Sequence, residues 1–317
     1  MITAQAARAF IQACYADGLK LPTVRWYESK LRPFTSALGN MPITEVSIVE
    51  LRGYVRALYE RKERYTGVDK KQVLPGGLSI ESIRGHIRAL KRFFAWCLSE
   101  GILPGGDPML KIRMPAAPRP VPKAITSANI RALLAACVCD GSRAGKRDAA
   151  IIAFLTDTGC RAGGLLGLTW ATLMLDSRRA QVHEKFDRGR VVPMSAYTAG
   201  LLRAWLAVAP HGATTVFCAL GTNTAAAPLT LSGLHQVLKR RAKQAQIVGR
   251  INPHSFRHAF GRRYLMAGGD ASTLSHIMGH SSVAVTLEVY AAFLHEESLK
   301  RFDELGLMNK LLKGGDE

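Results

Sequence analysis

Long apolar runs are missing from this chain of 317 residues. No stretch approaches the roughly 20 consecutive apolar residues that a membrane-spanning helix needs, so we expect no membrane partner. The first residues, MITAQAARAF, lack the basic region followed by an apolar region that marks a secretory signal. We therefore expect a cytoplasmic protein.

Cysteine is too sparse and too scattered for a disulfide framework. The sequence has six cysteines, and Cys137 and Cys139 in CVCD do not have the spacing of a metal site. Free cysteines are among the residues most often buried in proteins. We expect buried free thiols and no metal site.

Acidic residues are few beside the basic ones, 24 against 43, which gives a net charge of +19. The excess is shared along the chain, with 19 basic and 10 acidic residues up to residue 120 and 24 and 14 after it. The two parts thus carry +9 and +10. This distribution indicates a polyanion held from two sides, most simply a nucleic acid. The alternative is a protein that is merely basic.

A proline-rich segment predicts the domain boundary. KIRMPAAPRPVPKAIT contains Pro115, Pro118, Pro120 and Pro122, and such a sequence cannot continue a helix and favours an extended path. We place a linker at residues 114–123, a first domain at 1–113 and a second at 124–317. No internal repeat accompanies it.

The first domain is predicted to be a helical bundle, and its clearest helix lies within residues 79–101. Apolar residues recur there at helical spacing, with Ser79 as the expected N-cap and Gly101 as the expected end. The other side of this helix carries cations without interleaved acids, which favours a DNA-facing surface over an ordinary solvated face. These cations are Arg84, Arg88, Lys91 and Arg92.

The second domain is predicted to be helical with a small sheet. TSANIRALLAAC and RDAAIIAFLTDTG have the pattern of helices, and the second should end at Gly159. Residues 170–195 change period and predict three short strands with turns near 176–178 and 187–189. Residues 283–290 remain ambiguous, because Val283, Val285 and Leu287 alternate as in a strand while Thr286 and Tyr290 follow a helical step.

Several polar residues have the types that DNA cleavage without a metal requires. That reaction needs a nucleophile for phosphorus, cations for the phosphate oxygens and an acid for the leaving oxygen. Arginine suits phosphate because its guanidinium donates parallel hydrogen bonds, and a tyrosine can supply a phenolate nucleophile. The candidates are Arg161 in TGCR, Lys185 beside a strand turn, His254 and Arg257 in HSFR, His280 in MGH, and Tyr290.

These residues, in this order and with these flanks, closely resemble the tyrosine recombinase family of phage-integrase and Xer type. The resemblance covers nearly the whole chain and implies a helical core-binding domain, a linker and a mixed α/β catalytic domain with a small antiparallel sheet, closing on DNA as a C-shaped clamp. One departure is Gly164, which stands where the family usually has a glutamate three residues after the first arginine. That difference concerns the positioning of Arg161.

The resemblance implies site-specific recombination through a 3′-phosphotyrosine. Tyr290 is the expected nucleophile, Arg161 and Arg257 the phosphate clamp, and Lys185 the general acid. His254 and His280 support the phosphate, and no cofactor is expected. The expected DNA-binding cations are Arg84, Arg88, Lys91, Arg92, Arg188, Arg190, Lys239, Arg240, Arg241 and Lys243.

The resemblance also implies a homotetramer on two recombination sites, in which a C-terminal helix with Leu305, Met308, Leu311 and Leu312 passes to a neighbouring protomer. Packing of that helix on its own domain is the alternative. Two other classes of function stay open, a type IB topoisomerase-like enzyme and a non-catalytic DNA-binding regulator. The target DNA and any accessory proteins cannot be read from the sequence.

Overall fold

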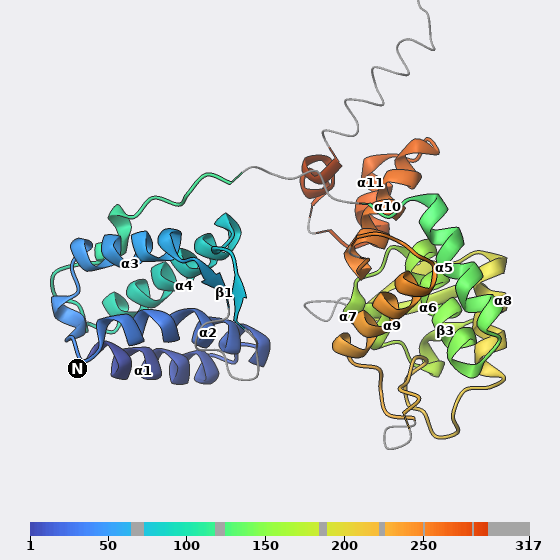
Figure 1. The fold of residues 1–317 in the computed structure, drawn as a ribbon, viewed down its shortest axis with the longest axis horizontal. Helices are drawn as coiled ribbons and strands as arrows, with labels where there is room; N and C mark the ends of the chain where they lie inside the picture. Colours follow the sequence, from blue (N-terminus) through green and yellow to red (C-terminus); the bar gives the residue numbers. More distant parts are fainter. Residues whose placement is uncertain are drawn as a thin grey trace, which may run out of the picture. The chain divides into compact units, whose positions relative to one another are not determined.

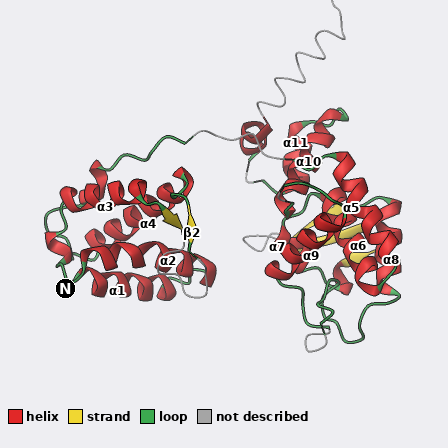
Figure 2. Ribbon diagram, viewed as in Figure 1, coloured by secondary structure: helices red, strands yellow, loops and turns green. Residues whose placement is uncertain are grey.

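The structure is a computed structural model that describes residues 1–64, 73–117, 124–183, 189–221, 226–249, 251–280 and 282–290. The chain divides into two compact units, Met1–Arg119 and Pro120–Glu317. Helices dominate both units and the strands are short (Figure 2). The predicted fold class, mainly helical with a small antiparallel sheet, is confirmed. Within the described ranges, no helix has the length and apolar character needed to cross a bilayer.

The first unit packs its helices around a core rich in aromatic rings. Phe34, Phe93 and Phe94 are fully buried and Phe10 is 1% exposed. The rings of Phe10 and Phe93 meet edge to face at 5.7 Å, a favourable geometry for aromatic pairs. The elements are α1 (Thr3–Ala16), α2 (Leu21–Leu38), η1 (Ile43–Glu45), α3 (Ile48–Glu60), β1 (Glu63–Arg64), β2 (Leu74–Pro75), α4 (Ile80–Ser99) and η2 (Pro108–Lys111).

The helix predicted within residues 79–101 is α4. Its N-cap is Ser79, whose hydroxyl accepts a hydrogen bond from the backbone N–H of Ser82, and its last residue is Ser99. The apolar face enters the core, and His86 is buried with it. His86 Nδ1 lies 3.2 Å from the carbonyl oxygen of Lys30 on α2 and 3.2 Å from the hydroxyl of Tyr54 on α3. The four cations predicted on this helix, Arg84, Arg88, Lys91 and Arg92, lie outside that core.

The second unit is organised around α6 (Arg143–Thr158), most of which is buried. α5, α8 and α10 all pack against α6, and Figure 1 shows α5 and α8 beside it. It ends at Gly159 in the left-handed conformation, as predicted. The other elements are α5 (Ser127–Asp140), α7 (Ala162–Leu166), η3 (Trp170–Thr172), β3 (Leu173–Met174), β4 (Arg179–His183), β5 (Gly189–Pro193), α8 (Ala196–Leu206), α9 (Leu231–Gln244), α10 (Pro253–Met266) and α11 (Ala271–Met278).

The strands form the predicted sheet in the order β3-β4-β5, with antiparallel neighbours. Ala180 and Val182 of β4 and Val192 of β5 are buried, whereas the residues between them face outward. This alternation is the period of a sheet with one face on the core. Residues 184–188 lie outside the described residues, so of the second predicted turn, near 187–189, only Gly189 is described, as the first residue of β5.

A buried ion network joins α6 to α9. Asp148 is fully buried and accepts hydrogen bonds from Arg147 Nε at 3.0 Å, Arg241 Nε at 2.8 Å and Arg240 Nη2 at 2.7 Å. Arg241 also pairs with Asp140 of α5 at 2.6 Å. A buried charge needs such partners because it has lost its water. The network therefore fixes the orientation of α9.

Candidate active site

The first part of the site is the turn after α6. Gly159 has φ of +55°, and a Cβ there would run into the ring of Phe260, so glycine is required for both conformation and space. The turn makes Arg161 the N-cap residue of α7. Arg161 Nη1 and Nη2 each donate to the carbonyl oxygen of Gly279 at 3.3 Å. A residue from the start of the unit thereby meets the end of α11.

α10 contributes two polar residues from its first turns. Asn252 caps the helix by accepting a hydrogen bond from the N–H of Ser255, and this fixes where the helix begins. His254 is exposed, whereas Arg257 is 5% exposed. Arg257 Nη1 donates to Gly159 O at 2.9 Å and Nη2 to Met278 O at 2.6 Å. The guanidinium therefore bridges the turn after α6 and the end of α11.

The end of α11 places His280. Gly279 ends the helix in the left-handed conformation with φ of +63°, and the chain then turns. His280 Nδ1 lies 2.6 Å from Oγ1 of Thr286, a fully buried residue. Residues 283–290 are helical, which resolves their ambiguous pattern: Thr286 and Tyr290 are one turn apart on the buried side.

Tyr290 lies against α10 and is 4% exposed. Its hydroxyl donates to Sδ of Met278 at 3.8 Å. The phenol ring rests on Gly261, where a Cβ would overlap the ring and its hydroxyl. Burial raises the pKa of Tyr290 to about 12, and the charge of Arg257 opposes that shift. The phenol is therefore protonated at neutral pH.

The histidines of α10 are biased toward the neutral form. Although His254 is exposed, the protein around its ring partly removes water from it and lowers its pKa, and the charges of Arg257 and Arg161 lower this pKa further, with a contribution from His235 of α9. The pKa of His258 is lowered by burial, then by His254 and Arg257. Cations gathered around an imidazole disfavour its protonation, so the site concentrates positive charge on its arginines.

The structure brings five of the predicted catalytic residues together: Arg161, His254, Arg257, His280 and Tyr290. Lys185 and Arg188 lie outside the described residues. Gly164, at the position of the departure noted in the sequence, is buried within α7. Sequence reasoning did not single out His258 or Gly261. Their signal was the helical spacing, since His258 follows His254 by one turn and Gly261 follows Arg257 by one turn.

The predicted DNA-binding cations have different environments. On α4, Arg92 is exposed and Lys91 is half-buried. Arg88 pairs with Glu81 at 3.0 Å, and Arg84 donates to Pro115 O at 3.0 Å. Arg84 is thus tied to the start of the predicted linker.

On α9, Lys239 and Lys243 are exposed and the Arg240 side chain is 48% exposed. Arg241 is 1% exposed and bound to Asp148 and Asp140. The expectation that Arg241 binds DNA therefore does not fit the structure, because its guanidinium is used in the buried ion network. Arg190 of β5 is half-buried.

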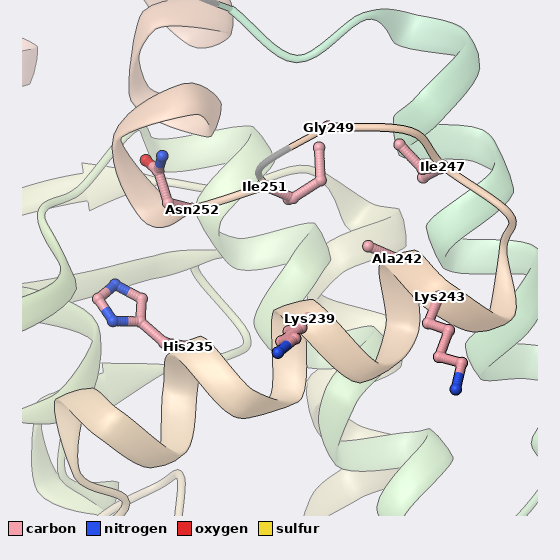
Figure 3. A pocket seen from close by; sticks show the side chains of 8 residues that line it. All are labelled: His235, Lys239, Ala242, Lys243, Ile247, Gly249, Ile251 and Asn252. Atoms are coloured by element: carbon pink, nitrogen blue, oxygen red, sulfur yellow. The ribbon is translucent and has the colours of Figure 1, made fainter. Parts of the chain in front are cut away.

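A cavity of about 560 Å³ lies along α9 beside the start of α10. Figure 3 shows His235, Lys239 and Lys243 following one another along the helix, and the segment with Gly249 and Ile251 running beside it to Asn252. Its polar side is basic, and Asn252 is two residues from His254. A hollow of this charge continues the cationic character of the site along α9.

Comparison with known proteins gives one consistent group. The profile described as the phage integrase family matches residues 123–297. Tyrosine recombinase XerC of Xanthomonas campestris pv. campestris is 26% identical over 271 residues, covering 85% of this chain and 77% of that protein. Tyrosine recombinase XerD of Pseudomonas aeruginosa is 29% identical over 219 residues, covering 67% and 72%.

Solved structures share the fold. The Tn1549 transposon integrase in complex with circular intermediate DNA has a TM-score of 0.71 at 21% identity, covering 92% of this chain and 95% of that one. A lambda integrase dimer bound to a core site has a TM-score of 0.68 at 16% identity, covering 90% and 97%.

Proposed function

Because the chain belongs to the phage integrase family, we propose that Tyr290 is the nucleophile with which it cuts double-stranded DNA. The chain is a site-specific DNA recombinase of the tyrosine type, an enzyme that cleaves DNA strands and rejoins them. The observation that supports the assignment is convergence at one place: the side chains of Arg161, Arg257 and Tyr290 all contact residues 278–279 at the end of α11.

The proposed reaction exchanges one phosphodiester for another. The oxygen of Tyr290 forms a bond to phosphorus, the bond from phosphorus to the 5′ oxygen breaks, and a 3′-phosphotyrosine and a 5′-hydroxyl result. Arg161 and Arg257 donate to the non-bridging oxygens and stabilise the charge that develops there. The covalent link retains the bond energy, so rejoining is the same reaction in reverse.

Proton transfers are divided among the remaining residues. His254, exposed beside both arginines, hydrogen-bonds the phosphate and assists removal of the proton from Tyr290. His280, held by Thr286, supports a phosphate oxygen. Lys185 is the proposed general acid for the leaving 5′ oxygen. This last assignment depends on the sequence resemblance, since Lys185 lies outside the described residues.

We propose that cations of each unit bind the DNA. On α9 these are Lys239, Arg240 and Lys243, which are exposed near the basic cavity. On α4 they are Arg88 and Arg92, which are exposed, and Lys91 and Arg84, which are half-buried. Lysine and arginine side chains that reach phosphates supply sequence-independent affinity. The solved complexes of the Tn1549 integrase and lambda integrase with DNA support a duplex as the partner.

For the assembly, we propose a homotetramer on two recombination sites, held by a C-terminal segment within residues 304–317, which lies outside the described residues. Head-to-tail exchange of a segment suits an interface that closes into a ring. Deletion of residues 304–317 should leave binding to a single half-site intact and abolish the paired-site complex. Light scattering of the complex measures this, and a truncated chain that still assembles four protomers would exclude the exchange.

The nucleophile is tested by removing one oxygen atom. Covalently trapped DNA is first recovered and sequenced to define the target site, and a nicked duplex of that site then serves as the substrate. Tyr290→Phe should bind this duplex and form no detergent-resistant adduct. Tyr197→Phe, which removes the hydroxyl of an exposed tyrosine on α8, should form the adduct normally. An adduct with Tyr290→Phe would exclude Tyr290 as the nucleophile.

A further inference from the structure

The hydroxyl of Tyr290 occupies a place that only a glycine leaves open. A Cβ on residue 261 would overlap Oη and Cζ of Tyr290, so the phenol rests directly on the backbone of α10. With Tyr290 4% exposed, its oxygen is shielded from solvent. A DNA phosphate cannot reach an oxygen placed there, so this is a resting position, and the phenol must leave it before attack.

Two polar groups in this resting position have weak partners or none. The hydroxyl of Tyr290 donates to the thioether of Met278 at 3.8 Å, and a thioether is a weak acceptor. Nδ1 of His258 is buried and has no hydrogen-bond partner in the part of the chain that the structure describes. Buried polar groups without good partners are costly. Both groups therefore gain if the phenol moves to a position where they meet.

The surface of α10 brings the three relevant positions together. His258 and Gly261 are three residues apart and Arg257 and Gly261 are four apart, so all three are neighbours on one side of the helix. The rings of His258 and Tyr290 are already in contact, edge to face, with centroids 6.4 Å apart and planes at 68°. A phenol that moves off Gly261 toward Arg257 therefore stays beside His258.

We propose that His258 is a positioning residue for the nucleophile: its Nδ1 accepts a hydrogen bond from the hydroxyl of Tyr290 when the phenol leaves its resting position on Gly261 for the phosphate. The proposal rests on the proposed role of Tyr290. The hydrogen bond holds the phenol oxygen near Arg257, whose guanidinium is fixed by Gly159 O and Met278 O. A neutral imidazole with its hydrogen on Nε2 has the free lone pair at Nδ1 that this requires.

A pair of substitutions separates the acceptor from the ring. His258→Phe keeps a planar ring against Tyr290 and removes the acceptor, whereas His258→Asn places an amide oxygen near the Nδ1 position. With the nicked duplex defined above, both variants should bind DNA as the unchanged protein does. His258→Phe should form the covalent complex about 10- to 100-fold more slowly, the order of loss that misplacement of a reacting group causes. His258→Asn should recover most of the rate.

The outcomes distinguish this role from packing and from a wrong nucleophile. Equal slowing by His258→Phe and His258→Asn would reduce His258 to a packing residue and overturn the proposal. A normal rate for His258→Phe, with Tyr290→Phe inactive, would also overturn it while leaving the proposed function intact. An adduct with Tyr290→Phe would instead refute the proposed function.

The resting position of Tyr290 on Gly261 is tested without DNA. Tetranitromethane modifies accessible tyrosines, so Tyr290 should be protected in the folded full chain relative to Tyr197, which is 58% exposed. Gly261→Ala adds a methyl group where the hydroxyl lies and should increase nitration of Tyr290 at least severalfold, measured by peptide mass spectrometry. Circular dichroism checks the fold. Unchanged protection of Tyr290 in a folded Gly261→Ala chain would overturn the resting position.

Discussion

Asp148→Asn is the substitution with the largest effect expected on the second unit. The carboxylate is fully buried and pairs with Arg147 and Arg241, which are 4% and 1% exposed. Asparagine preserves the size of the side chain but leaves these guanidiniums without their shared anion. Removing one partner of a buried ion pair costs about 3–5 kcal/mol. Arg241 keeps Asp140, so we expect the lower part of that range.

Arg240 offers a matched control for this prediction. It binds the same carboxylate at 2.7 Å, but its side chain is 48% exposed, and exposed pairs contribute about 0.2–1 kcal/mol. Arg240→Gln should therefore lower the free energy of unfolding by less than about 1 kcal/mol. Both variants disturb the same ion network: Asp148→Asn removes the buried shared anion, whereas Arg240→Gln keeps that anion and removes one exposed partner.

Hydrogen exchange during a urea titration measures both variants. Peptides from α6 and α9 report the second unit separately from the first. At a slope of about 2–3 kcal/mol per molar urea, a loss of about 3–4 kcal/mol lowers the midpoint by about 1–2 M. A shift below about 0.5 M for Asp148→Asn, or equal shifts for both variants, would refute the reasoning from burial.

Three further predictions concern charge. Burial, and then the charge of Lys30, lowers the pKa of His86 to about 4, so the folded first unit favours the neutral imidazole. The unfolded chain takes up a proton near pH 6.5, so the free energy of unfolding is constant above that pH and falls by about 3 kcal/mol as the pH drops toward 4. Hydrogen exchange of α4 should show that loss, and His86→Phe should flatten it. Lys239→Gln should reduce the slope of log affinity against log salt by about 0.9, whereas Arg56→Gln on α3, with the same change in charge, should leave it unchanged. Lys185→Ala should slow cleavage by about 10²–10⁴, and a 5′-bridging sulfur should restore the rate because a thiolate leaves without a proton.

Local patterns in the sequence predicted the elements that depend on local physics. Ser79 marks a helix start because its hydroxyl accepts a hydrogen bond from a backbone N–H three residues later. Gly159 marks a helix end because it takes up the left-handed conformation directly after the last helical residue. The change of period over residues 170–195 predicted the strands, and in the structure β4 has one buried face. Residues 283–290 could not be decided from the sequence, because a β-branched, alternating run fits either structure locally. In the structure these residues form a helix, and Thr286 within it lies 2.6 Å from Nδ1 of His280.

The site was predictable in composition but not in arrangement. The sequence supplied His254 and Arg257 as candidates in HSFR, and the structure places both near Arg161. The burial of Arg241 could not be foreseen, because its partner Asp148 lies far upstream and the neighbouring Arg240 has the same side chain. The contact of Tyr290 with Gly261 also required the tertiary structure, since a glycine within a helix pattern has many explanations.

The second unit uses arginine in two ways, and the acceptor decides which. Around Asp148, one buried carboxylate is shared by the guanidiniums of Arg147 and Arg241, so these arginines hold helices together. At the site, Arg161 and Arg257 are oriented by the carbonyl oxygens of Gly159, Met278 and Gly279. A carbonyl oxygen fixes the direction of a guanidinium by accepting its hydrogen bond. The donors of these arginines are therefore held in place by the protein, and preorganised donors need no rearrangement when charge develops on a phosphate.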